Sequence, residues 1–152
     1  ARFSDFASLR YDNVKGPDDL PLFKPPYSHI TAIDMNTGDH LWQLPIGETP
    51  ERVLNHPDLQ DMDIPSTGTG SNAAMGVTET VFMYASTASD GTSMLYFVDK
   101  ISGEQLGGIE VEDRTNYGLM NYIHNGKQYI ILQTGPKLTA MALYEDTDDD
   151  SY

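Results

Sequence analysis

One lysine in the first third of the chain stands where a cationic side chain is unusual. Lys24 lies between the apolar Phe23 and the pair Pro25-Pro26, whose rings restrict the local backbone. An ammonium group held in place can stabilise negative charge that develops on a bound molecule during a reaction. From the residues alone, a solvated loop lysine is the favoured interpretation.

The other polar residues give little support for metal or nucleophile chemistry. Histidine stands at 29, 40, 56 and 124, with no HxxxH or HxH spacing, which disfavours a zinc site. His56, next to Pro57, is a candidate on the substrate side, but a surface histidine is the favoured interpretation. The chain has no cysteine, which removes thiolate nucleophiles, disulfides and Cys-based metal sites. The acidic run at 145–150 lacks the glycine and distant glutamate of an EF-hand, so we expect a solvated, disordered tail there.

The charge balance narrows the class of partner. The 152 residues include 23 Asp and Glu against 9 Lys and Arg, which gives a formal net charge of -14. Such a surface repels phosphate backbones and anionic headgroups, so we expect no nucleic-acid partner. The chain starts at Ala1 without a secretion signal, so we expect a processed protein or a fragment.

A short repeat organises the chain. The segment ITAIDMNTGDHLW (30–42) aligns without a gap with LYFVDKISGEQLG (95–107), and LTAMAL (138–143) is a third, partial copy. Asp34 aligns with Asp99, Gly38 with Gly103, and Trp42 with Gly107, so the second copy lacks the tryptophan. A four-stranded propeller blade repeats every ~40–45 residues. The chain fits that period if a loop is inserted after the first copy.

Alternating apolar residues between turn residues predict an all-β fold of antiparallel strands. Asn125-Gly126 is a strong hairpin signal because both residue types tolerate positive φ. ERVLNHPDL (51–59) could form a helical turn or two at most. The predicted strands are ITAID, HLWQL, TVFMYAS, MLYFVD, EQLGGIEV, LMNYIH and KQYIILQT.

Four residues of the first copy have a structural explanation. The Asp34 and Thr37 side chains can cap the backbone of the turn, and Gly38 can supply its left-handed position. Trp42 is large, flat and able to donate a hydrogen bond, so it can wedge between neighbouring sheets. We therefore interpret these four residues as blade-docking residues.

This Ala-x-Asp-x-x-Thr-Gly-x-x-x-Trp pattern resembles the tryptophan-docking motif of pyrroloquinoline quinone (PQQ) dehydrogenases, whose fold is an eight-bladed β-propeller. The motif also occurs in non-enzymatic propeller scaffolds, but three other segments narrow the resemblance. PLFKPPY (21–27), TPER with NHP (49–57) and NGKQYI (125–130) resemble segments of quinoprotein glucose dehydrogenases. The order of these segments matches the C-terminal part of that family.

The resemblance implies that this chain is a C-terminal fragment, a partial β-propeller of about two blades. The expected parts are an irregular lead-in (1–29), the outer two strands of one blade (30–44), an inserted loop (45–70), a complete four-stranded blade (71–112), three strands of the last blade (113–144) and the acidic tail (145–152).

The resemblance also implies a chemistry. In this family, PQQ lies on a Ca²⁺ ion at the propeller axis and oxidises a sugar or other alcohol in the periplasm, and the electrons pass to a quinone or another acceptor. Lys24 matches a lysine of that family that approaches the quinone oxygens. The resemblance therefore favours a catalytic and cofactor-binding role for Lys24 over a solvated loop lysine. Gly70, Ser71 and Asn72 are expected to begin the inner strand of the complete blade, beside the cofactor; a polar loop is an equally good interpretation. The Ca²⁺ ligands and the general base are implied to lie upstream of this chain.

Two alternatives remain at this point. The parent is either a PQQ dehydrogenase or a non-catalytic propeller scaffold or binding module that uses the same motif. Lys24 and the NGKQYI hairpin favour the enzyme. In either case we expect the fragment to self-associate, because the other blades that would cover its blade faces are missing. The side chains expected to be exposed on these faces are Trp42, Phe82, Tyr84, Phe97 and Tyr129.

Overall fold

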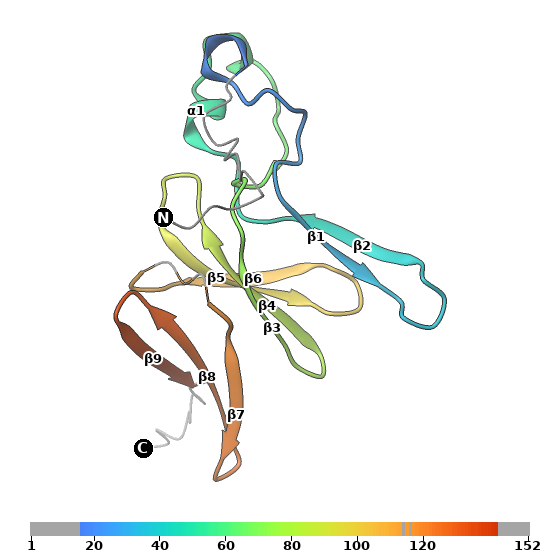
Figure 1. Ribbon diagram of the computed structural model, residues 1–152, viewed down its shortest axis with the longest axis vertical. Helices are drawn as coiled ribbons and strands as arrows, with labels where there is room; N and C mark the ends of the chain where they lie inside the picture. The colour runs from blue at the N-terminus through green and yellow to red at the C-terminus, as the bar shows by residue number, and fades with distance from the viewer. Residues whose placement is uncertain (1–15, 114, 116, 143–152) are drawn as a thin grey trace, which may run out of the picture.

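The strands form three antiparallel sheets that follow one another along the sequence (Figure 1). The computed structural model describes residues 16–113, 115 and 117–142. The first sheet is β1 (His29–Ile33) and β2 (His40–Pro45); the second is β3 (Ala74–Val77), β4 (Val81–Thr87), β5 (Ser93–Asp99) and β6 (Gln105–Glu110); the third is β7 (Met120–His124), β8 (Lys127–Thr134) and β9 (Lys137–Ala142). The helices are short: η2 (Pro17–Asp19), α1 (Glu51–Leu54) and η3 (Pro57–Leu59). The all-β prediction and its antiparallel strands are confirmed, and the predicted tail lies outside the described residues.

The turns of the two full repeat copies are capped in the same way. The Asp34 carboxylate accepts a hydrogen bond from the Asn36 N–H at 2.8 Å. In the second copy, the Asp99 carboxylate accepts from the corresponding Ile101 N–H at 3.0 Å, and also from the Ser102 N–H at 2.7 Å. Hydrogen bonds from Ser102 are also the main cause that lowers the pKa of Asp99 below its ordinary value. The aspartates therefore have the turn-capping role that the repeat predicts.

The central strands of the second sheet, β4 and β5, are largely buried on both faces, which explains the continuous apolar run of β4. Alternate residues of a strand point to opposite faces, so Phe82 and Tyr84 pack toward the first sheet while Met83 and Ala85 pack toward the third. The core between the first and second sheets contains Ile30, Ile46, Phe82, Tyr84, Tyr96 and Val98. The core between the second and third sheets contains Ala74, Met83, Ala85, Leu95, Val111 and Leu132.

Trp42 joins the first sheet to the β5–β6 turn of the second. Its indole Nε1–H donates to the Lys100 carbonyl at 3.0 Å. The ring covers Gly103 so closely that a Cβ at this glycine would lie 2.6 Å from Trp42 Cγ. Gly103 also has a φ of +76°, which favours glycine. The docking role predicted for the tryptophan is confirmed.

The expected exposure of aromatic residues is wrong for the two at the centre of the second sheet. Phe82 and Tyr84 are 6% and 1% exposed, because the first sheet of this same chain covers them. Trp42, Phe97 and Tyr129 are half-buried. The exposed apolar side chains lie elsewhere, and those on the third sheet include Met120, Tyr122, Ile123 and Leu138.

We still expect the chain to self-associate, through the third sheet. Within the described residues, β9 pairs only with β8, and an open strand edge recruits other strands. Leu138 on β9 is 77% exposed, so Leu138→Asp should weaken the self-association with little effect on folding. Sedimentation at micromolar concentration measures the self-association of the wild-type chain and of the variant. A wild-type chain that sediments as a monomer of 16.9 kDa contradicts the prediction.

Two stacked tyrosines in the first core predict alkaline instability. The Tyr84 and Tyr96 rings lie 5.0 Å apart between centroids, and burial is the main cause that raises the pKa of each to about 12. Between pH 10 and about 12 the unfolded chain loses protons that the folded chain keeps, so the free energy of unfolding falls as the pH rises through this window. Below pH 10 the stabilisation that comes from keeping these two hydroxyls protonated is fully present.

A spectroscopic titration measures this effect. In the folded chain, part of the rise in the ultraviolet absorbance of ionised tyrosine should occur only well above pH 10. Tyr84→Phe and Tyr96→Phe should each reduce this part. If every tyrosine of the folded chain ionises together near pH 10, burial does not protect these two hydroxyls.

Candidate functional site

Two loops lie together at one end of the sheets, and they carry all four predicted site residues. Figure 1 shows the segment before β1 next to the segment between β2 and β3. The Tyr27 N–H donates to the Thr67 carbonyl at 2.7 Å, and the Gly70 N–H donates to the Ser28 Oγ at 3.1 Å. Residues 40 or more positions apart are therefore fixed against each other.

Lys24 stands in the first of these loops with its side chain in solvent. It is exposed, as is the neighbouring Phe23, which is 76% exposed. Within the described residues, Lys24 makes no hydrogen bond or ion pair that would occupy its ammonium group. The cation is thus available to an anionic ligand at this end of the molecule.

Gly70, Ser71 and Asn72 precede the inner strand and do not begin it. The strand β3 starts at Ala74, so the expected strand assignment for these three residues is wrong. The reason lies in Gly70, whose φ of +77° is incompatible with an extended strand. The Ser71 N–H donates to the Thr69 Oγ1 at 3.3 Å, which turns the chain further. The polar-loop interpretation describes their conformation.

Two buried threonines hold the inserted loop closed. Thr49 and Thr67 are 4% and 3% exposed. The Thr67 N–H donates to the Thr49 Oγ1 at 3.0 Å, and the Thr49 hydroxyl donates to the Pro65 carbonyl at 3.2 Å. The Thr49 hydroxyl thus satisfies two backbone groups that the loop would otherwise bury unpaired. Sequence reasoning missed both threonines, because nothing in their spacing distinguishes them from the exposed threonines of the chain.

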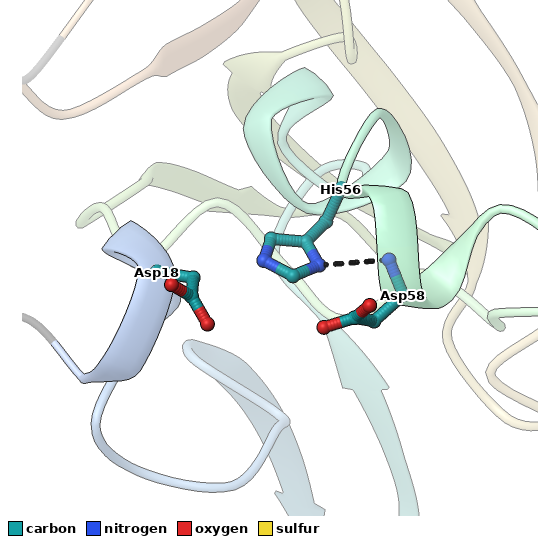
Figure 2. Close-up of side chains that lie close together, drawn as sticks. All are labelled: Asp18, His56 and Asp58. Carbon is teal, nitrogen blue, oxygen red and sulfur yellow. Dashed lines mark hydrogen bonds between the residues drawn. The ribbon is translucent and has the colours of Figure 1, made fainter.

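His56 is buried, so the surface position expected for it is wrong. It is 8% exposed, and its Nδ1 accepts a hydrogen bond from the Asp58 N–H at 3.2 Å. This bond caps η3. Figure 2 shows the other ring nitrogen facing Asp18, which belongs to η2.

The cluster of Asp18, His56 and Asp58 has the donor atoms of a metal site but not the expected proton arrangement. Its ligand atoms lie within 4.8 Å of one another. A neutral imidazole that accepts at Nδ1 carries its proton on Nε2, so the ring presents a donor toward Asp18. A metal ligand needs a free lone pair there. The cluster places the lead-in beside the inserted loop.

The comparisons with known proteins agree with the sheet arrangement. Residues 2–130 match the model of the glucose/ethanol/alcohol dehydrogenase PQQ family, β-propeller domain. The chain is 30% identical over 114 residues to the glycerol dehydrogenase large subunit of Gluconobacter oxydans (strain 621H). That match covers 74% of this chain and 15% of the relative. No solved structure matches significantly.

These matches cover most of the described sheets, so the three sheets form part of a β-propeller. In the described part of the chain, the helices are all too short to cross a bilayer. The chain belongs to the family of PQQ-dependent dehydrogenases with a β-propeller domain.

Proposed function

We propose that this chain is the C-terminal part of a periplasmic PQQ-dependent dehydrogenase that oxidises a hydroxyl group of a sugar or related polyol. The observation that carries this proposal is the placement of Lys24, a cation open to solvent, in a loop tied to Gly70 at one end of the propeller sheets. A relative whose name is glycerol dehydrogenase large subunit adds support for a polyol substrate.

The residues present fit PQQ, which is a flat molecule with carboxylate and quinone oxygens. Lys24 offers an ammonium group to those oxygens. Gly70 is exposed, and a Cβ there would have only Tyr27 Cβ within 4 Å, at 3.7 Å, so a ligand could approach the backbone at this position. Ser71 and Asn72 would add polar side chains at the same edge. The bound cofactor supplies the hydride acceptor for the oxidation of the substrate carbon.

The role that we assign to Lys24 is electrostatic. Its ammonium would hold a cofactor oxygen in place and stabilise the negative charge that the oxygen gains when the substrate is oxidised. The flanking Pro25 and Pro26 limit the freedom of the loop backbone, so a ligand that binds Lys24 has to order little more than the lysine side chain. A general base, a Ca²⁺ ion and its ligands, and a quinone or other electron acceptor complete the proposed enzyme, and we assign none of them to residues of this chain.

Reconstitution of the full-length protein tests the proposal. The cofactor-free protein should reduce an artificial electron acceptor only after PQQ and Ca²⁺ are added together, with glycerol, glucose and ethanol compared as substrates. Activity with glycerol or glucose well above that with ethanol supports the polyol assignment. A protein that binds no PQQ would be a non-catalytic scaffold.

The isolated chain should bind PQQ weakly and oxidise no sugar. The proposed axial site is shared among all blades, and this chain spans a small part of the length of its relative. The preorganised donors of the other blades are thus missing, and the ordering cost of binding is not offset. A titration of the chain with PQQ and Ca²⁺ measures this; submicromolar affinity would contradict it.

A further inference from the structure

We propose that Ser28 is a positioning residue for cofactor binding, because it holds the two segments of the candidate site together. This inference rests on the proposed function and assigns a role to a side chain outside the four predicted site residues. Ser28 lies directly before β1, four positions after Lys24.

Ser28 makes hydrogen bonds to two other segments at once. Its Oγ accepts from the Gly70 N–H at 3.1 Å and donates to the Ile46 carbonyl at 3.4 Å. Its backbone carbonyl accepts from the Ile46 N–H at 3.0 Å. One hydroxyl therefore connects the Lys24 loop, the end of β2 and the loop that contains Gly70.

The chain at Gly68 passes so close to Ser28 that only glycine fits. A Cβ at Gly68 would lie 2.4 Å from the Ser28 carbonyl oxygen and 2.9 Å from its Oγ. The φ of Gly68 is +76°, a conformation that also favours glycine. The loop from Gly68 to Gly70 thus follows the surface of Ser28, and the hydroxyl fixes its far end.

Removal of this hydroxyl should affect ligand binding more than folding. Gly70 is exposed, so water can pair with its N–H when the serine is absent, and little folding free energy is lost. The Gly70–Asn72 segment then gains freedom relative to Lys24. A ligand that contacts both segments must restore their order when it binds, and this lowers its affinity.

The test uses the full-length protein prepared without cofactor. We compare Ser28→Ala with Ser66→Ala. The second variant is a matched control because the Ser66 hydroxyl also donates to a backbone carbonyl, that of Gly47 at 2.8 Å, within the inserted loop. We expect Ser28→Ala to raise the dissociation constant of PQQ, titrated in the presence of Ca²⁺, by about tenfold, and Ser66→Ala by less than about twofold. The substrate KM at saturating PQQ should stay unchanged in both.

Hydrogen exchange gives a second measurement that does not need the loaded enzyme. The amide of Gly70 should exchange about fivefold or more faster in Ser28→Ala and at the wild-type rate in Ser66→Ala. Unchanged exchange at Gly70 or unchanged PQQ affinity in Ser28→Ala overturns the inference, as does an equal loss of affinity in Ser66→Ala. Wild-type protein that binds no PQQ refutes the proposed function itself.

Discussion

Replacing Lys24 by alanine in the full-length enzyme is expected to lower kcat about 100-fold. Removal of one preorganised group that stabilises developing negative charge typically costs a factor of about 10²–10³. The side chain is exposed and has no partner within the described residues, so the unfolding temperature should change by less than about 2 °C. Steady-state kinetics and thermal unfolding of the same preparations measure the two effects.

Lys127→Ala is the matched control for this experiment. Lys127 is also exposed, but it begins β8 beside the hairpin turn, outside the two loops of the candidate site. This variant should keep the wild-type kcat. Equal turnover in Lys24→Ala and Lys127→Ala would remove Lys24 from the proposed site, while equal losses in both would indicate a general effect of surface charge.

The contact between Trp42 and Gly103 predicts the largest effect on stability. Gly103→Ala should cost about 3 kcal/mol: about 1 kcal/mol for a side chain at positive φ, and about 2 kcal/mol because the added methyl displaces the indole ring. Gly38 occupies the same turn position in the first copy, with a φ of +81° and no atom within 4 Å of a Cβ. Gly38→Ala should therefore cost only about 1 kcal/mol.

Urea unfolding of the single and double variants separates these two contributions. In a Trp42→Ala background the ring is gone and only the Cβ of residue 42 stays close to the new methyl, at 3.0 Å, so the two glycine substitutions should become similar in cost. This is a double-mutant cycle, and the coupling between positions 42 and 103 should be about 2 kcal/mol. A gap that persists without the tryptophan would mean that the ring is not the source of the strain.

Local patterns predicted the turns and strands of this chain because their causes are local. Asn125 and Gly126 adopt φ values of 50° and 77°, as the hairpin signal requires. KQYIILQT coincides with β8. The predicted helical turns of the inserted loop are also present, as α1 and η3.

The errors concern residues whose surroundings come from distant segments. Gly70 is held outside the strand by Ser28, 42 positions earlier, and no local pattern records that bond. Phe82 and Tyr84 were expected at an exposed face, but the first sheet covers them. His56 is buried beside Asp18, 38 positions earlier. Burial and long-range hydrogen bonds depend on how the sheets pack, which the alternation of apolar residues does not specify.

During synthesis on the ribosome, Trp42 emerges long before the segment that it contacts. Strands within each sheet are joined by short turns, and such hairpins form in about 1–10 μs. Trp42 and Lys100, in contrast, are 58 positions apart. At ~5–20 residues per second, the ribosome needs roughly 3 to 12 seconds between these two residues. We expect the first hairpin to exist during this interval with its indole ring in solvent, where a chaperone that recognises apolar groups can bind it.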